Sequence, residues 1–362
     1  MGKRNKVTTR DIAEELGISQ STVSMVLSGR TGVSFTPETI KRVKEAAEAM
    51  GYTKPTASEK NRDRALEKTI VILCPIATNG YYSMMIHSIT EYARNYGYTV
   101  LTATTNRDGA NEGIYLELLN KTRLAGLVSL YPLSQFRELD ALSKTVPVIS
   151  VGDKPPSCHF DSVELDSKKP GYLIGEHLLS LGHTRITYIS TPIRSREISR
   201  VNRLNGVKNS FCNYGVPESQ LEVRYPSQSA FGQYPRENAE YQNGYAQTLK
   251  ALADGTKSTA FIGNNDMVAF GIMAALCDRG YRIPNDFSVC GFDNIPLCAM
   301  PQISLTTVDH AAMQKGREAV NMIYRKNQQK KQGLERNYVV RLEYEPQLIV
   351  RKSSGKQKKP LH

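Results

Sequence analysis

The sequence predicts two kinds of folded unit in one chain: a small all-α headpiece, and a larger α/β core of two lobes with parallel sheets. Two observations predict this division. The first fifty residues contain three short amphipathic helical patterns with helix caps, whereas residues 68–350 alternate between β-branched apolar runs and helix-length stretches. Regular alternation of strands and helices is typical of parallel, doubly wound sheets.

The composition excludes few functions. The chain has 362 residues, enough for two or three domains, and 47 lysines and arginines against 35 acidic residues give a net charge of +12. A basic balance is compatible with binding to a polyanion, but many basic proteins bind none. For the basic segments 325–331 and 351–359 we expect solvated surface and a free tail.

The cysteines and the lengths of the apolar runs indicate the cellular compartment of the protein. The 6 cysteines form no C-x-x-C pair and mostly lie in apolar runs, which favours buried free thiols over disulfides or a zinc site. No apolar run is as long as a membrane span, and no hydrophobic segment follows the basic residues at the start. We therefore expect a cytoplasmic protein.

The sequence of the headpiece predicts a helix-turn-helix motif. Thr8 and Asp11 have the spacing of a capping box, and Gly17 permits the left-handed turn that ends the first helix. Ser19 is the expected cap of a second helix that ends near Leu27, and Thr36 precedes the proline that opens a third. Two short helices joined by a glycine-containing turn are typical of this motif. A small helical bundle without a partner is the alternative.

The second helix carries an apolar seam on one side and small polar residues on the other. In a helix-turn-helix the second helix lies in the major groove of DNA, with its N-terminal side chains nearest the base edges. We therefore expect base contacts from Gln20 and Ser21. Hydroxyl groups and one arginine are candidates for phosphate contacts: Thr8, Arg10, Ser19, Thr22 and Ser24.

The sequence of the core predicts two similar lobes. Apolar strand-like runs begin with "TIVILCPI" at 69–76 and return as "RITYIS", "TAFIGN" and "SVCGFD". Helices are expected near 82–96, 171–181, 203–214, 238–253 and 266–279. Because nearly three hundred residues exceed the needs of one such sheet, we expect two sheets, with a cleft at the C-terminal ends of their strands.

Residues 8–52, "TTRDIAEELGISQSTVSMVLSGR" through "AAEAMGY", closely resemble the DNA-binding headpiece of the lactose-repressor (LacI/GalR) family. Two positions depart from the family pattern: Met25 stands where arginine is common, and Ser28 where asparagine is usual. Methionine makes no bidentate hydrogen bond to guanine, so the resemblance implies an apolar contact at this position, such as one with a thymine methyl group. Arg30, just after the second helix, completes the expected DNA-binding set.

The linker departs from the family as well. In the family this segment forms a short hinge helix whose leucine wedges into the minor groove, a known mode of DNA bending. Here Pro55 comes one residue late, Thr56 replaces the asparagine, and Leu66 is the first leucine, several residues beyond the expected place. We favour a polar linker over a hinge helix.

The core resembles the same family, whose fold is shared with type I periplasmic sugar-binding proteins. The order of N-D-x-x-A-x-G in "NNDMVAFG" and G-F-D in "CGFDN" carries this resemblance. It implies effector contacts from four residues: Tyr82, Arg203, Asn265 and Asp293. An aromatic ring, a guanidinium, an amide and a carboxylate suit a polyhydroxylated ligand. Each of these residues also has a structural alternative, because Asn265 and Asp293 could cap turns or helices and Arg203 could form a surface ion pair. For Asp266 and His183 we favour structural roles.

We expect four segments along the chain: a DNA-binding domain at 1–54, a linker at 55–68, a core at 69–352 and a basic tail at 353–362. Within the core, one lobe is expected to comprise approximately 69–167 with 304–336, and the other 168–303 with 337–352.

The expected protein is a dimeric, sequence-specific transcription factor, most simply a repressor. It binds a roughly palindromic operator and is controlled by a small molecule, a sugar or sugar derivative. No phosphate-binding loop, H-E-x-x-H, G-x-S-x-G or G-x-G-x-x-G motif occurs, so we expect no enzyme, no cofactor and no metal. Two alternatives stay open: a regulator controlled by a protein partner or by no ligand, and a sugar-binding module without a DNA role.

Overall fold

The computed structural model divides into two compact units, Met1–Ala65 and Leu66–His362, which we call the headpiece unit and the core. Each is described by itself. The residues that the structure describes are 7–29, 34–54, 56, 61, 64–152, 158–164, 166–193, 198–334 and 338–358.

The headpiece unit contains the three predicted helices. They are α1 (Thr9–Leu16), α2 (Gln20–Ser28) and α3 (Pro37–Ala49). The capping box forms as predicted, because Asp11 N donates to Thr8 Oγ1 at 3.3 Å and Thr8 N donates to Asp11 Oδ2 at 2.7 Å. Gly17 ends α1 with a φ of 64°. A non-glycine residue would be strained at that angle, so this glycine sets the sharp turn into α2.

One apolar cluster holds the three helices together. Its buried members come in pairs from each helix: Ile12 and Ala13, Val23 and Val26, and Val43 and Ala47. The seam predicted for α2 is therefore confirmed, with Leu27 half-buried at its margin. Since one side of α2 is committed to this core, the polar side chains of α2 lie on its other side.

The described residues of the core form two six-stranded sheets, one in each lobe. In lobe 1 the order is β11 (Arg341–Glu343), β5 (Asp161–Glu164), β4 (Val148–Val151), β3 (Gly126–Ser129), β1 (Thr69–Cys74) and β2 (Thr99–Thr104). In lobe 2 it is β12 (Gln347–Ile349), β10 (Thr306–Asp309), β9 (Ser288–Asp293), β8 (Ala260–Gly263), β6 (Ile186–Ile189) and β7 (Leu221–Arg224).

Neighbouring strands are parallel in both sheets, as predicted, except that β12 is antiparallel to β10. Every residue of β1, from Thr69 to Cys74, is buried. A strand covered by helices on both faces needs such a continuous apolar run.

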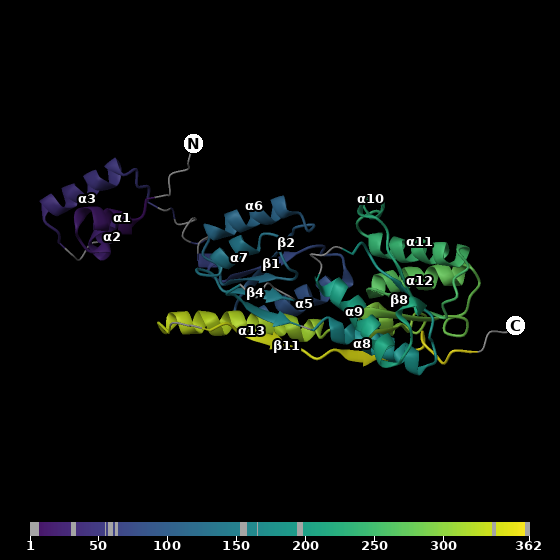
Figure 1. Cartoon of the computed structure of the whole chain (residues 1–362). Coiled ribbons are helices and arrows are strands. Elements are labelled where there is room, and N and C mark those ends of the chain that lie inside the picture. The colour runs from purple at the N-terminus through teal and green to yellow at the C-terminus, as the bar shows by residue number, and fades with distance from the viewer. Residues whose placement is uncertain are drawn as a thin grey trace. The chain divides into compact units, whose positions relative to one another are not determined.

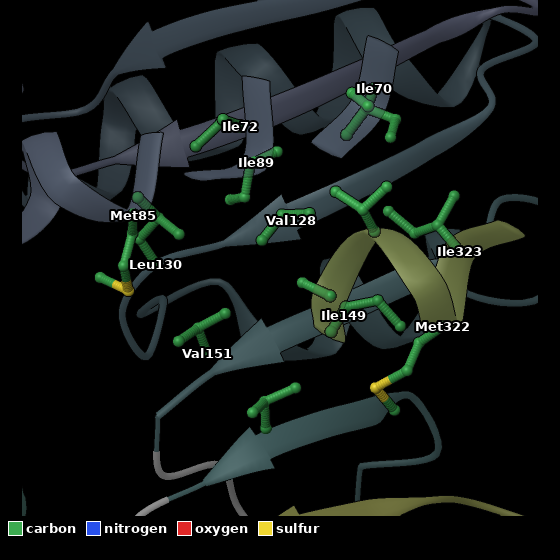
Figure 2. Packing of buried hydrophobic residues seen from close by; sticks show 14 of the residues in the cluster. Ile70, Ile72, Met85, Ile89, Val128, Leu130, Ile149, Val151, Met322 and Ile323 are labelled. Atoms are coloured by element: carbon green, nitrogen blue, oxygen red, sulfur yellow. The ribbon is translucent and has the colours of Figure 1, made fainter. Parts of the chain in front are cut away.

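Helices cover both faces of each sheet (Figure 1). Those of lobe 1 are α5 (Gly80–Arg94) and α13 (Ala312–Lys331) on one face, and α6 (Gly109–Asn120) and α7 (Phe136–Leu142) on the other. Figure 2 shows the first of these interfaces, where Met85 and Ile89 of α5 and Ile323 of α13 meet strand residues such as Val128.

Lobe 2 repeats the arrangement. Its main helices are α8 (Lys168–Ser180) and α9 (Ile198–Asn213) on one face, and α11 (Ala239–Ala253) and α12 (Asp266–Asp278) on the other. The short elements are α10 (Gln228–Phe231), η1 (Glu218–Gln220) and η2 (Pro296–Ala299).

The order of the described strands shows that the chain crosses between the lobes from β5 to α8, from β10 to α13, and from β11 to β12. Two short segments therefore differ from the expected lobe division. Residues 306–309, expected in the first lobe, pair with β9 in lobe 2, and residues 341–343, expected in the second lobe, pair with β5 in lobe 1. Strands this short carry no sequence signal for the sheet that they join.

The expected free tail is also corrected. Residues 353–358 lie on lobe 2, where Ser353 is buried and exchanges backbone and side-chain hydrogen bonds with Val289. Gln357 N donates to Leu181 O at 2.9 Å, and Lys358 Nζ donates to Asn285 Oδ1 at 2.7 Å. The basic composition suggested a free tail because the two backbone bonds, at Ser353 and Gln357, leave no signal in the side chains of the sequence.

Leu66 belongs to the core, because it packs against the lobe 1 cluster that contains Val71 and Leu73. The leucine that we considered for minor-groove insertion therefore has an apolar partner inside the protein. Of the cysteines, Cys74, Cys158, Cys290 and Cys298 are buried and Cys212 and Cys277 are exposed, and all are free thiols. Among the described helices, none has the length and apolarity needed to cross a membrane.

Candidate functional site

The outward side of α2 is one candidate site. Gln20, Ser21 and Ser24 are exposed, and Met25 is half-buried beside them. Residues 20, 21, 24 and 25 share one helix face, because positions i, i+3 and i+4 of an α-helix lie on the same side. The candidate base-reading residues therefore point away from the headpiece core, as docking of α2 into a groove requires.

Hydrogen bonds within the headpiece hold these side chains in place. Ser19 Oγ accepts from Thr22 N at 3.1 Å and lies 2.7 Å from Ser21 Oγ, so it caps α2. Gln20 Nε2 donates to Thr9 Oγ1 of α1 at 3.2 Å. These hydrogen bonds are exposed, so water already competes for the same donors and acceptors. Replacing them with hydrogen bonds to DNA would therefore cost little free energy.

Two of the expected phosphate contacts come from α1 and its N-cap. Thr8 is exposed at the start of α1, and Arg10 is exposed with its Nε 3.0 Å from Glu14 Oε1. An exposed ion pair of this kind contributes at most about 1 kcal/mol, so it leaves the Arg10 guanidinium available to a stronger anion. Arg30, also expected to contact DNA, lies outside the described residues.

The second candidate site is a cleft of about 870 Å³ in the core. Both lobes line it, at the C-terminal ends of their strands and the N-terminal ends of their helices. This volume lies within the range of about 300–1,000 Å³ that is typical of small-molecule sites. Tyr82, Arg203, Asn265 and Asp293, the four residues implied by the family resemblance, all line this cleft.

Tyr82 enters the cleft from the first turn of α5. Its hydroxyl accepts from Arg107 Nη2 at 2.9 Å, and its ring lies 5.5 Å from that of Tyr81 in an edge-to-face arrangement. Burial raises the pKa of Tyr82, so its hydroxyl remains protonated and offers a hydrogen to a ligand.

Arg203 is placed by the close packing of α9 on α8. A Cβ on Gly171 of α8 would collide with the carbonyl oxygen of Arg203, so only glycine allows the two helices to approach this far. The guanidinium lies over the Phe292 ring at 4.6 Å and its Nη1 donates to the Asn264 carbonyl. These contacts aim it into the cleft instead of into a surface pair.

Asn265 serves as the N-cap of α12. Its Oδ1 accepts from Val268 N at 2.9 Å, which is the structural role that the sequence left open. Because the cap occupies this oxygen, the amide nitrogen of Asn265 is the group that can face a ligand. Asp266 is structural, as we favoured, since its buried carboxylate accepts from Ile295 N, Cys298 Sγ and Thr307 Oγ1.

Asp293 ends β9 with a φ of 114°, a strained angle for a residue with a side chain, which turns the residue at the strand end. Its carboxylate lies 3.9 Å from His310 Nε2. Burial raises the pKa of Asp293 well above its ordinary value and lowers that of His310 well below 6.5. With the imidazole neutral, this contact is not a salt bridge.

Four buried polar atoms on the cleft wall have no hydrogen-bond partner among the described residues: Arg203 Nε, Asn238 Oδ1, Asn264 Oδ1 and His310 Nε2. A buried polar atom without a partner costs about 1–3 kcal/mol. These atoms therefore offer fixed donors and acceptors to a polar molecule in the cleft.

Several cleft residues escaped the sequence analysis, among them Arg107, Arg200, His310 and Lys315. Arg107 lies in the loop that follows β2. Ligands of parallel sheets bind beyond the C-terminal ends of the strands, and this rule could have identified Arg107 from the sequence. His183 is buried with both ring nitrogens hydrogen-bonded, to Thr259 and Gly355, so its predicted structural role is confirmed. In the described part of the chain no His, Cys, Asp and Glu cluster fits a metal ion.

Comparisons with known proteins match both units of the chain. Residues 8–55 match the family model for bacterial regulatory proteins of the lacI family, and residues 176–354 match that for periplasmic binding protein-like domains. The chain is 28% identical over 348 residues to an HTH-type transcriptional repressor PurR of Haemophilus influenzae, covering 96% of this chain and 98% of that protein.

Two solved structures share the fold. One is a LacI family transcriptional regulator from Enterococcus faecium with bound ribose, with a TM-score of 0.68 and 24% identity over 80% of this chain and 100% of that one. The other is the Lac repressor dimer bound to operator and the anti-inducer ONPF, with a TM-score of 0.65 and 23% identity over 97% and 100% of the two chains.

A helix-turn-helix with an exposed polar recognition face, on the same chain as a two-lobed core with a polar cleft, defines the class of DNA-binding transcriptional regulators. Residues 8–55 form a DNA-binding domain of the lacI family of bacterial regulatory proteins, and residues 176–354 form a periplasmic binding protein-like domain.

Proposed function

We propose that this regulator is a dimeric repressor whose α2 helices read two half-sites of a roughly palindromic operator. The observation that carries this proposal is the division of α2 into a buried apolar seam and an exposed face with Gln20, Ser21 and Ser24. Two-fold symmetry of a dimer corresponds to two-fold symmetry in the DNA that it binds. Because the DNA that it would bind lies in the bacterial cytoplasm, we place its action there.

In this proposal Gln20 and Ser21 contact base edges, and Met25 contacts an apolar group such as a thymine methyl. Hydroxyls and arginine fix the helix on the phosphates: Thr8, Arg10, Ser19, Thr22, Ser24 and Arg30. The proposal predicts a linear fall of log affinity with log salt, by about 0.9 per phosphate neutralised. Fluorescence anisotropy with labelled duplex DNA measures it, and an affinity independent of salt would contradict phosphate contacts.

The cleft is proposed to bind a polyhydroxylated effector, a sugar or sugar derivative, through Tyr82, Arg203, Asn265 and Asp293. A carboxyl group and a guanidinium together can accept from and donate to neighbouring hydroxyls. The effector would change DNA affinity only to the extent that it binds one lobe arrangement more tightly than the other.

Titration calorimetry of the full chain against sugars and nucleobases tests the effector. A heat of binding from a sugar, lost in Arg203→Ala, supports the proposal, whereas a heat from a nucleobase alone would contradict a polyhydroxylated effector. Silence across the panel, with DNA binding intact, favours a regulator that answers to a protein partner or to no ligand. Ligand binding without DNA binding favours a sugar-binding module instead.

A further inference from the structure

Lobe 1 is strongly basic at the end where its parallel strands begin. The cleft lies at the opposite end, where these strands finish. Five described segments lie where the strands begin: 66–68, 95–98, 121–125, 143–147 and 330–334. Within them Glu67 is the single acidic residue. The same segments carry six exposed cations, which we call the basic end: Lys68, Lys121, Arg123, Lys144, Lys330 and Lys331.

Hydrogen bonds bring these segments together although they lie far apart in the sequence. Helix α13 runs along the lobe 1 sheet (Figure 1), and its last turn carries Lys330 and Lys331. Lys330 Nζ donates to Thr145 O at 3.1 Å, just before β4. One turn earlier, Asn327 Nδ2 donates to Ala125 O at 2.7 Å, just before β3. The basic end is therefore one region of the surface.

Most of this positive charge is not neutralised by the described part of the core. Arg123 Nη1 lies 3.5 Å from Glu67 Oε1, and Lys121 Nζ lies 2.9 Å from Glu117 Oε1. Lys144 acts on the Asp140 carboxylate only from beyond ion-pair distance. Four members of the basic end form no ion pair with a described residue: Lys68, Lys144, Lys330 and Lys331. Cations gathered on one surface favour an anionic partner.

The chain enters the core at this same end. The core begins at Leu66, two residues before Lys68, and β1 follows at Thr69. Tyr52 packs against the headpiece cluster, so the 13 residues 53–65 join the two units. A chain of this length spans at most about 50 Å when fully extended. A duplex held by α2 is therefore tethered to the end of the core that carries the cations.

The chemistry of a DNA duplex suits the basic end. Double-stranded DNA carries one negative charge per about 1.7 Å of its axis, so several separated cations can each meet a phosphate. Exposed lysines make such contacts without reading the base sequence. No member of the basic end lines the cleft, so a small effector bound there does not account for them.

We propose that the basic end of lobe 1 is a second DNA-binding surface, which contacts phosphates of the same duplex that α2 holds. This proposal rests on the proposed function of α2 and adds to it a contact that is independent of sequence. The core then contributes directly to DNA affinity, in addition to carrying the cleft.

The test compares full-length chains on a duplex that contains the half-sites selected by the wild type and extends several helical turns beyond them. The test variant combines four substitutions in the basic end: Lys68→Gln, Lys144→Gln, Lys330→Gln and Lys331→Gln. The control variant loses the same charge from exposed lysines of lobe 2: Lys250→Gln, Lys257→Gln, Lys352→Gln and Lys356→Gln. An arginine variant replaces the first four lysines by arginine and keeps their charge.

Salt dependence of binding, measured by fluorescence anisotropy, is the main readout. Log affinity falls with log salt by about 0.9 for each phosphate neutralised, so the test variant should lower this slope by about 2–4 per chain. Its affinity at physiological salt should fall by about tenfold or more. The control and arginine variants should keep the wild-type slope. An unchanged slope in the test variant, or an equal decrease in the control variant, overturns the proposal.

A smaller variant guards against a folding defect. Lys68→Gln with Lys144→Gln breaks no side-chain hydrogen bond that the structure describes, and should show about half the decrease in slope. Its thermal unfolding should match that of the wild type. Hydroxyl-radical footprinting gives a direct view of the contact, since the wild type should protect backbone positions that the test variant leaves exposed. Identical footprints overturn the proposal.

A failure of this inference is separable from a failure of the proposed function. If the wild type selects no DNA sequence, the proposed reading of DNA by α2 is wrong. If the wild type selects half-sites and the test variant binds them with the same salt slope, α2 still reads DNA and only the role of the basic end is wrong.

Discussion

Asn79 joins the two lobes of the core with the same amide that begins α5. Its Nδ2 donates to Glu240 Oε2 of lobe 2 at 2.8 Å, while its Oδ1 accepts from Tyr81 N at 3.0 Å. The first turn of α5 carries Tyr82 into the cleft and packs Gly80 against Ile295 of lobe 2. The contact between the lobes and the position of a ligand-facing ring are therefore tied to one side chain.

Glu240→Ala removes the acceptor of this bond without touching the α5 cap. We expect the free energy of unfolding to fall by about 0.5–1.5 kcal/mol, the usual net contribution of one hydrogen bond. Glu240→Gln, which keeps an acceptor oxygen, should restore most of the loss, and Glu237→Ala, at an exposed neighbour, should change little. Chemical denaturation measures all three; equal stability of Glu240→Ala and wild type would show that the bond contributes nothing.

His310 predicts a pH dependence. Burial lowers its pKa well below 6.5, helped by the charges of Arg203 and Lys315, so the folded chain holds the imidazole neutral. The unfolded chain takes up a proton on this imidazole near pH 6.5, whereas the folded chain does not. The folded state is therefore fully stable with respect to this group above pH 6.5 and loses stability relative to the unfolded state as pH falls below it. Between pH 7 and 5.5 the loss from this one group is about 1 kcal/mol.

Denaturation of His310→Gln at both pH values isolates this term, because His177 and His183, whose pKa values burial also lowers, remain in both proteins. We expect the wild type to lose more stability than the variant on acidification. His87→Gln, at an exposed position of α5, serves as the control. A variant that loses as much as the wild type would mean that His310 is charged in the folded protein.

Met25→Arg should change which DNA sequence is preferred. A guanidinium at this position can donate two hydrogen bonds to guanine, worth about 1–3 kcal/mol of discrimination, whereas methionine donates none. Selection from a random duplex library should enrich guanine at one position per half-site for the variant and not for the wild type. Identical enriched sequences would place residue 25 away from the bases.

Leu66→Ala tests whether this leucine stabilises the core. Leu66 is half-buried against the lobe 1 cluster, so we expect a loss of about 1 kcal/mol, less than the roughly 2–5 kcal/mol of a fully buried leucine. Leu334→Ala, at a residue 58% exposed, should be close to neutral. A Leu66→Ala chain of unchanged stability but weaker DNA binding would instead favour a wedge in the minor groove.

The headpiece was predictable because its signals are local. A capping box at Thr8, a left-handed Gly17 and a proline after Thr36 each act within a few residues, and all three occur as expected. The parallel sheets followed from continuous apolar runs such as 69–74, which only a strand buried on both faces explains.

Long-range contacts were not predictable in the same way. The contact between Asn79 and Glu240 joins residues 161 positions apart, and no periodicity signals it. The short strands at 306–309 and 341–343 joined the opposite lobes from those expected, because three or four residues do not specify a partner sheet. Asn265 shows a further limit, since the same motif serves a helix cap and a cleft wall.

The central claim is that α2 reads DNA with its exposed face, and selection from a random duplex library with the full chain tests it most directly. We predict that the wild type enriches a two-fold related pair of half-sites, and that Gln20→Ala loses this enrichment while its headpiece still folds. Glu48→Gln, exposed on α3, should select the same sites as the wild type. No enriched sequence with the wild type, or the same sequence with Gln20→Ala, would contradict the account.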